Sequence, residues 1–334
     1  MSAVMVAAAD LAGELAWHAW QASAAGLIAL ALAAALRRRA PRAAALIISL
    51  ALLKFIVPPV IRVPIAFGDA AAMLLNPFVL VPPGQEVSDA WRLILAAAAL
   101  ATLAIAALTA ARVARHARRV RQLRARATLA TSGPAAESLA RATARLRLRV
   151  APVLLISDDA EGPFATGVWR PTIVLPRALA RELDAPALDI VIAHELVHHR
   201  RRDLPMAWCA AVATSLFWFT PVTWRLARVL NELREECCDA DVTRLGFAQP
   251  RAYADALLFA AAVPGGATAL QMRDCHPLER RLRRILDQPS PLAPPVVALI
   301  VTLFAILCMP ATPFASPWPS GDDIVRVERR VIVR

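Results

Sequence analysis

The segment His194-Glu195-Leu196-Val197-His198 constrains this chain more than any other short run of residues. Two histidines four positions apart return to nearly the same face of an α-helix, which has 3.6 residues per turn. Neutral imidazole nitrogens suit zinc, and the glutamate between them is placed to act on a water molecule as a general base. We therefore predict a helix at 188–202 that carries a zinc site. The alternative is a surface helix with two solvated histidines.

The chain around this segment is unusually apolar. Hydrophobic residues make up 58% of the sequence and the mean hydropathy is +0.51. This exceeds the composition of an ordinary soluble enzyme, so we expect part of the chain to contact membrane lipid. The five cysteines show no paired spacing, which argues against a disulfide framework and fits a reducing compartment.

Four apolar stretches are candidates to span the membrane, at about 15–36, 43–61, 91–111 and 295–309. Crossing takes roughly 20 apolar residues, which makes the second and fourth the weaker candidates. The net charge of +12 is almost wholly due to arginine, and arginines cluster at 37–42, 112–126 and 280–284. Because positive residues stay on the cytoplasmic side, both termini are expected outside and the segment from 112 to 294 in the cytoplasm. This is the layout of a multi-pass protein of a bacterial inner (plasma) membrane.

The expected domains follow from these spans. They are a membrane domain with three spans at 1–111, a cytoplasmic metallopeptidase domain at 112–293, a fourth span at 294–310 and a short external tail at 311–334. The first span could instead be a signal peptide, but it lacks a basic start and is followed by arginines, which favours a retained anchor.

The stretch 112–126 holds seven arginines. It could bind nucleic acid, or it could be a helix that leaves the membrane along anionic headgroups. No aromatic residues are interleaved to stack on bases, so we favour lipid and expect no direct contact with nucleic acid. The oligomeric state is left open.

Short strands are expected in the cytoplasmic segment. One is Val153–Ser157, and the run from Pro163 to Pro176 indicates two more, hinged near Gly167 and at Arg170-Pro171. The pair is either a hairpin that covers the core or an edge strand that holds an extended substrate, and the sequence favours neither.

A catalytic zinc needs a third protein ligand, and the best donors lie between 231 and 241. Glu235 and Asp239 share a helix face, so one can ligate while the other orients a neighbour. Glu232, Glu236 and Asp239 form a competing face. Cys238 is either a ligand or, as we favour, a small buried side chain beside the site. Asp203 either supports a ligand or caps a helix.

The tryptophan-rich stretch 204–224 lies between the histidines and Glu235. A single membrane crossing there would put Glu235 on the opposite side from His194 and His198. If Glu235 is a ligand, the stretch must dip and return, lie in the membrane interface, or pack as protein core.

With these features, the chain resembles the BlaR/MecR family of integral-membrane zinc metallopeptidases. The resemblance is carried by Pro163-Phe164 with Gly167, Pro171 and Ile173-Val174-Leu175-Pro176; by His194 to His198 with Asp203; by Glu235 with Cys238-Asp239; and by Arg280 to Leu286. It implies Zn²⁺ as cofactor with His194, His198 and Glu235 as ligands, and Glu195 as general base. It also implies proteolysis in the cytoplasm, typically of a DNA-binding repressor such as those of the BlaI/MecI type.

The expected fold is a mainly α membrane protein with about four transmembrane helices and a cytoplasmic α+β, gluzincin-like metallopeptidase domain that carries a small β-sheet. The leading hypothesis for function is a membrane-embedded zinc endopeptidase in regulated signalling. Its closest alternative is an HtpX-type quality-control protease. A non-catalytic zinc receptor or scaffold is a further alternative, against which the intact Glu195 argues.

Two further expectations concern the activating signal and the stabilisation of the oxyanion formed in the reaction. Receptors of the family carry a large penicillin-binding sensor after the last span, whereas residues 311–334 follow it here. We therefore expect no direct covalent sensing of a β-lactam. Besides zinc, a second group is expected to stabilise the oxyanion of the reaction. The candidates are His276, Tyr253 and backbone groups.

Overall fold

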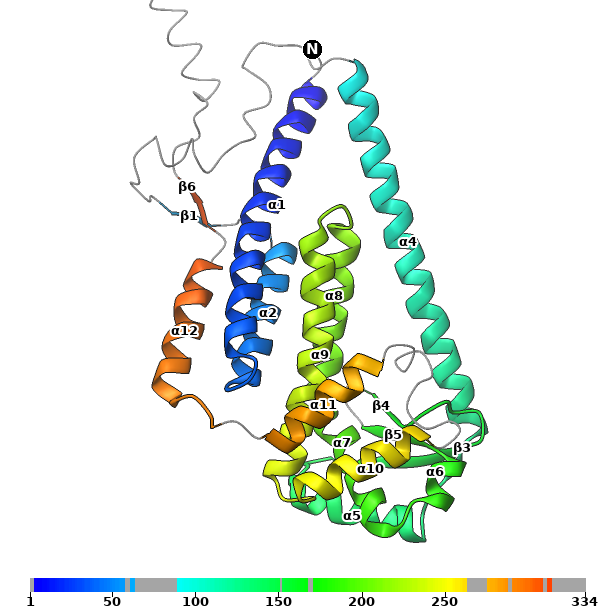
Figure 1. The fold of residues 1–334 in the computed structure, drawn as a ribbon. Helices are drawn as coiled ribbons and strands as arrows, with labels where there is room; N and C mark the ends of the chain where they lie inside the picture. The colour runs from blue at the N-terminus through cyan, green and yellow to red at the C-terminus, as the bar shows by residue number, and fades with distance from the viewer. Residues whose placement is uncertain are drawn as a thin grey trace, which may run out of the picture.

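The computed structural model describes residues 3–57, 61–63, 89–150, 152–167, 171–262, 275–287, 290–308 and 311–313. The protein is mainly helical and carries a small mixed sheet, as the sequence predicts. Long helices run side by side, and a compact unit that contains the sheet lies at one end of them (Figure 1).

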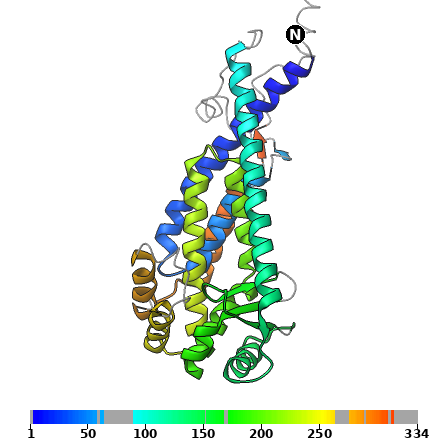
Figure 2. The same cartoon turned by 90° about the vertical axis from the view of Figure 1, so that its right-hand side faces the viewer.

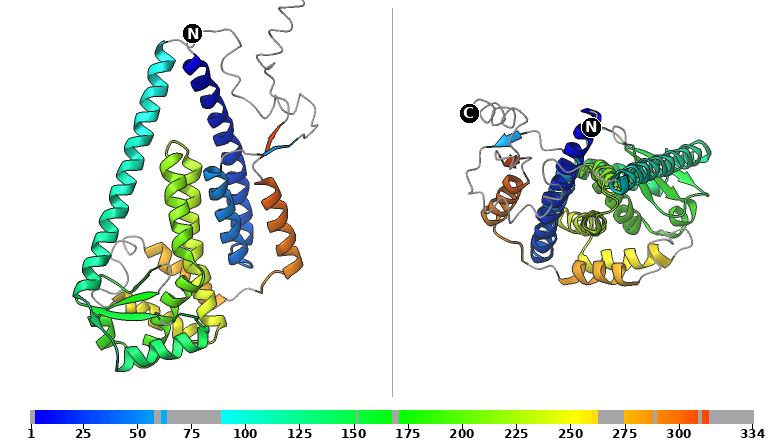
Figure 3. Two further views of the ribbon diagram at one scale, coloured as in Figure 1. Left: turned by 180° about the vertical axis from the view of Figure 1, so that it is seen from behind. Right: turned by 90° about the horizontal axis from the view of Figure 1, so that it is seen from above.

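Helices α1 (Ala3–Leu36) and α2 (Pro41–Ile56) form a hairpin. Small residues such as Ala22, Ala29 and Ala44 are fully buried and allow the helices to approach closely. Helix α12 (Pro294–Leu307) packs against α2, while α4 (Asp89–Arg126) descends on the far side and diverges from α1 (Figure 3). Two three-residue strands, β1 (Ile61–Val63) and β6 (Ala311–Pro313), pair in parallel.

The helices correspond in part to the expected membrane spans. By length and composition, one helix in the described ranges can cross a membrane, at His18–Leu36, and α12 is a shorter apolar helix. The expected third span and the basic stretch after it form the single continuous helix α4. The boundary drawn at residue 111 therefore falls inside a helix.

The tryptophan-rich stretch forms most of a helical hairpin. Helix α8 (Asp203–Leu216) leads away from the sheet and α9 (Pro221–Arg244) returns to it (Figures 1 and 2). The turn between them is tied by the Thr223 hydroxyl, which donates to the carbonyls of Phe217 and Thr220. At 1.5 Å per residue, the 14 residues of α8 cover only about 21 Å. The chain thus comes back to the end it left.

The sheet has four strands in the order β2-β3-β5-β4. Strands β3 and β5 are parallel, with Leu155 opposite Val174, and β4 is antiparallel to β5, with Ala165 opposite Ile173. Strand β4 is consequently an edge strand. The strands are β2 (Thr128–Leu129), β3 (Val153–Ser157), β4 (Phe164–Thr166) and β5 (Thr172–Pro176).

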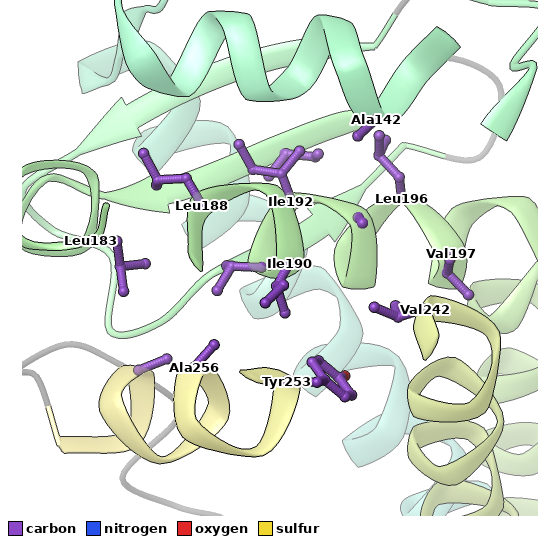
Figure 4. Close-up of a cluster of buried hydrophobic side chains, with 14 of the residues drawn as sticks. Ala142, Leu183, Leu188, Ile190, Ile192, Leu196, Val197, Val242, Tyr253 and Ala256 are labelled. Carbon is purple, nitrogen blue, oxygen red and sulfur yellow. The ribbon is translucent and has the colours of Figure 1, made fainter. Parts of the chain in front are cut away.

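One hydrophobic core holds this unit together, and α7 (Ala185–Arg200) lies at its centre. Leu188, Ile192 and Leu196 of α7 are fully buried (Figure 4). Each such side chain contributes about 1.5–3 kcal/mol when removed from water. Helices α5 (Pro134–Leu146) and α10 (Pro250–Ala262) pack on α7, while α6 (Arg177–Glu182) packs on β5 and β3, and α11 (Cys275–Asp287) packs on α10 and α9. Burial on several sides fixes the direction in which the side chains of α7 point.

Candidate metal and catalytic site

Helix α7 positions both histidines of the motif. Its first turn is capped by the Asp184 carboxylate, which accepts a hydrogen bond from the Ala187 amide at 2.9 Å. The helix ends at Arg200, two residues before the predicted end. Arg202 then adopts a left-handed conformation with φ of 58° and turns the chain into α8. This corner brings Asp203 back against the end of α7.

The hydrogen bond of His198 defines its tautomer. Its Nδ1 lies 2.7 Å from Oδ2 of the buried Asp203. An ionised carboxylate only accepts hydrogen bonds, so the imidazole proton is on Nδ1 and the lone pair is on Nε2.

The same reasoning applies to His194. The Tyr253 hydroxyl donates to Oδ1 of Asp239 at 2.6 Å, so it accepts from Nδ1 of His194, which lies 2.9 Å away. The lone pair of His194 is therefore also on Nε2. The two Nε2 atoms are 3.2 Å apart.

Glu235 of α9 completes this group. One of its carboxylate oxygens is 3.5 Å from Nε2 of His194 and the other is 3.5 Å from Nε2 of His198. Tetrahedral zinc with bonds of about 2.0–2.1 Å separates its ligand atoms by about 3.3–3.4 Å. Two lone pairs that converge at 3.2 Å also repel each other unless a cation lies between them. The residues present therefore fit a zinc ion.

The charges around the group favour ionised and polarised ligands. Burial alone would raise the pKa of Glu235, but the two histidines and Arg281 lower it by more, so its pKa is well below the usual range. Burial lowers the pKa of His198, whereas the hydrogen bond to Asp203 and the carboxylates of Glu235 and Glu195 raise it above 6.5.

Glu195 lies beside this group, on the wall of a cavity of about 290 Å³. Strand β4 forms another part of the wall through Phe164 to Thr166, followed by Gly167. Gly167 has a φ of 85°, which only glycine adopts readily, and it ends the strand at the cavity. The apolar lining comes from Phe164, Ile190, Val191, Leu257 and Ala260.

Cys238 lies behind His198, with its sulfur 3.2 Å from Nδ1 of His198 and 3.5 Å from Oδ2 of Asp203. These three residues could also hold a metal, but there His198 would offer the nitrogen that is already bonded to Asp203. Burial and nearby carboxylates raise the pKa of the Cys238 thiol well above its usual value, which keeps it neutral.

The other candidates are placed as follows. Glu236 is buried against Arg37 and Arg284, and Glu232 contacts Arg37 and Arg280, so the competing acidic face is engaged by arginines. Asp239 shares the Glu235 face and contacts Tyr253. His276 belongs to α11, but its side chain is outside the described residues.

Arg281 was missed by the sequence reasoning. Its Nε and Nη2 donate to the two oxygens of Asp239, each at 2.8 Å, and its Nη1 lies 3.3 Å from Glu235. The sequence uses the arginines at 280–284 for membrane orientation and for the family resemblance, but it predicts no contact of Arg281 with the site. A sequence signal was present, because arginines at 280, 281 and 284 match acids at 232, 235, 236 and 239 with complementary helical spacing.

Known proteins and a family model match parts of this chain. The chain is 28% identical to the regulatory protein BlaR1 of Bacillus licheniformis over 99 residues, which are 30% of this chain and 16% of that protein. It is 26% identical to the methicillin resistance mecR1 protein of Staphylococcus aureus over 89 residues, 27% of this chain and 15% of that protein. The aligned segments thus cover about one sixth of these relatives. A family model described as BlaR1 peptidase M56 matches residues 17–285, most of the sequence. The chain therefore belongs to the BlaR1 peptidase M56 family.

Proposed function

We propose that this protein is a membrane-embedded zinc endopeptidase that cleaves a cytoplasmic protein in regulated signalling. The observation that carries the proposal is the convergence of three donors, His194, His198 and Glu235, beside Glu195 on the wall of one cavity. Membership of a peptidase family supports it.

The residues divide the chemistry between them. A zinc ion held by His194, His198 and Glu235 would supply Lewis acidity, which lowers the pKa of water from 15.7 to near 7. Glu195 accepts the proton of the attacking water and can pass it to the leaving amine. Asp203 and the Tyr253 hydroxyl hold the two imidazoles with their Nε2 atoms 3.2 Å apart, where they would bind the ion.

Strand β4 is the proposed site for the substrate backbone. It is one of the two edge strands of the sheet, and Phe164 to Thr166 line the same cavity as Glu195. An extended peptide can add to such an edge through main-chain hydrogen bonds. The apolar lining around Ile190, Val191 and Leu257 suits an uncharged substrate side chain next to the cleaved bond.

The membrane layout is part of the proposal. Four spans, both termini outside and the segment 112–293 in the cytoplasm would place the site on the inner face of the membrane. Exposed apolar side chains on the α8–α9 hairpin support its contact with lipid: Trp208, Val212, Leu216, Phe219 and Trp224. Amphipathic tryptophans suit the interfacial zone.

The proposed substrate is a transcriptional repressor of the BlaI/MecI type. The relatives are named as a regulatory protein and a methicillin resistance protein, which supports a role in signalling. A small winged-helix repressor encoded beside this protein would be the first candidate to test.

The test compares wild type with Glu195→Gln in the full chain, purified in detergent. The variant should bind zinc as the wild type does and lose at least about 100-fold in cleavage rate, because the general base is gone. Glu182→Gln, which changes an exposed acid on α6, is the control and should cleave normally. Full activity of Glu195→Gln would refute the mechanism.

A further inference from the structure

Arg281 is the one cation that contacts two different acids of the candidate site in the described residues. Helix α11 carries it, and only 16% of its side chain is exposed. Its guanidinium donates two hydrogen bonds of 2.8 Å to the carboxylate of the buried Asp239. Its Nη1 lies 3.3 Å from Oε2 of Glu235. An arginine fork matches a carboxylate in this two-point manner, whereas a lysine offers a single charge.

These contacts tie two of the three candidate ligands to one guanidinium. Glu235 is contacted directly. His194 is held indirectly, because its Nδ1 bonds the Tyr253 hydroxyl, which donates to Asp239, which accepts from Arg281. The third ligand, His198, is held separately by Asp203.

We propose that Arg281 is a positioning residue that sets His194 and Glu235 for metal binding. The proposal rests on the zinc site proposed above. Without the guanidinium, Asp239 would be a buried carboxylate, 3% exposed, whose remaining side-chain partners in the described residues are the Tyr253 hydroxyl at 2.6 Å and Nδ1 of His194 at 3.5 Å. An uncompensated buried charge is costly, so Asp239 would turn toward other donors or solvent and Tyr253 would follow it. His194 and Glu235 would then sample orientations in which their donor atoms no longer converge.

A substrate-binding role is the competing explanation, because Arg281 also lines the cavity. Its Nε, Nη1 and Nη2 are already directed at Asp239 and Glu235, however, which leaves few N–H groups for a peptide. The two roles differ in a measurable way. A positioning residue changes zinc affinity in the absence of substrate, and a substrate contact does not.

The experiment measures zinc affinity by competition with a chromogenic chelator, on full-length protein in detergent with no peptide present. Arg281→Met should weaken zinc binding by about 10–100-fold, the usual effect of losing a partner of a metal ligand. Arg281→Lys should recover part of the loss, since it restores the charge without the fork. Arg280→Met is the matched control, because Arg280 is the next residue of α11 and pairs with Glu232 away from the ligands. It should bind zinc as the wild type does.

Tyr253→Phe provides a second route, should Arg281→Met fold poorly. It keeps the buried ring and removes the hydroxyl that links His194 to Asp239, so it should also weaken zinc binding by about tenfold or more. Wild-type zinc affinity in both Arg281→Met and Tyr253→Phe would overturn the positioning role, even if the KM for a peptide rose. Failure of the wild type to bind zinc would instead refute the proposed function itself.

Discussion

At the scale of single residues, the site is defined by which nitrogen of each histidine is already used. Asp203 occupies Nδ1 of His198, and the chain from Tyr253 to Asp239 occupies Nδ1 of His194. Both free lone pairs therefore face the same point. A carboxylate or hydroxyl behind a ligand contributes to metal affinity without touching the metal.

Asp203→Asn should weaken zinc binding by about 10-fold, because an amide can turn either its oxygen or its nitrogen toward His198 and no longer fixes the tautomer. The same chelator competition measures this. Asp255→Asn, at an exposed position on α10, should leave the affinity unchanged. Equal affinities in Asp203→Asn and wild type would show that Asp203 only closes the corner between α7 and α8.

Zinc affinity should also depend on pH. An imidazolium has no free lone pair, so protons compete with zinc for His198. The carboxylate neighbours of His198 raise its pKa above 6.5. As the pH is lowered, zinc affinity should therefore start to fall before the pH reaches 6.5. Titrations between about pH 6 and pH 8 test this. If the midpoint of the loss of zinc affinity lay below pH 6.5, it would contradict the raised pKa of His198.

The sequence predicts this site unevenly. The spacing of His194 and His198 is sufficient to put both on one helix face, and four-residue spacing groups Glu235 with Asp239. Tyr253 and Arg281 could not be located in the same way, since they come from helices whose packing on α7 and α9 depends on the whole core. Local periodicity carries no information about such distant neighbours.

At the scale of elements, the acidic side chains of α9 lie on two different faces of the helix. Glu235 and Asp239 point to the candidate site, while Glu236 is only 2% exposed and lies against Arg37 of the α1–α2 corner and Arg284 of α11. Helix α9 thus joins the N-terminal helices to the sheet-containing unit.

Glu236→Ala should destabilise the protein by about 3–5 kcal/mol, because it leaves two partly buried guanidinium groups without their shared carboxylate. Thermal unfolding followed by intrinsic fluorescence measures the change. Glu279→Ala breaks an exposed pair with Arg283 on α11 and should cost only about 0–1 kcal/mol. Similar melting temperatures for both variants would mean that the Glu236 cluster is not structural.

The elements themselves were partly predictable. The short apolar run and the β-branched residues of Val153–Ser157 predict β3 with its observed bounds. The predicted helix at 188–202 begins three residues earlier, where Asp184 caps it, and ends two residues earlier at the left-handed corner. Strand β2 has two residues and no pattern of its own, and it exists because it pairs with β3.

At the scale of the whole molecule, the α8–α9 hairpin keeps α7 and the end of α9 together. The sequence predicts that this stretch returns if Glu235 is a ligand, in any of three geometries. The structure has two packed antiparallel helices, whose shared core with α1 and α2 includes Phe217, Leu226 and Leu230. Hydropathy alone cannot separate such a hairpin from a single crossing.

Cysteine labelling in a cysteine-free background tests this arrangement within the membrane. Cysteines introduced at the exposed positions Arg200 on α7 and Ala240 on α9 should both react with a membrane-impermeant maleimide only after the cells are opened. Phe219→Cys, at the exposed turn of the hairpin, should be shielded by lipid. Labelling of position 240 in intact cells would refute a metal site shared by α7 and α9, because it would put the two helix ends on opposite sides of the membrane.

The adjacency of Glu235 and Glu236 has a mechanical consequence. Successive residues of an α-helix point about 100° apart. Helix α9 therefore directs the Glu235 carboxylate toward the histidines and the Glu236 carboxylate toward Arg37. A carboxylate about 5–6 Å from the axis moves by about 1 Å when the helix rotates by about 10°. A twist imposed on α9 at the Arg37 contact would therefore shift the Glu235 carboxylate by a comparable amount, so one rotation of α9 would move both the Arg37 contact and the candidate site.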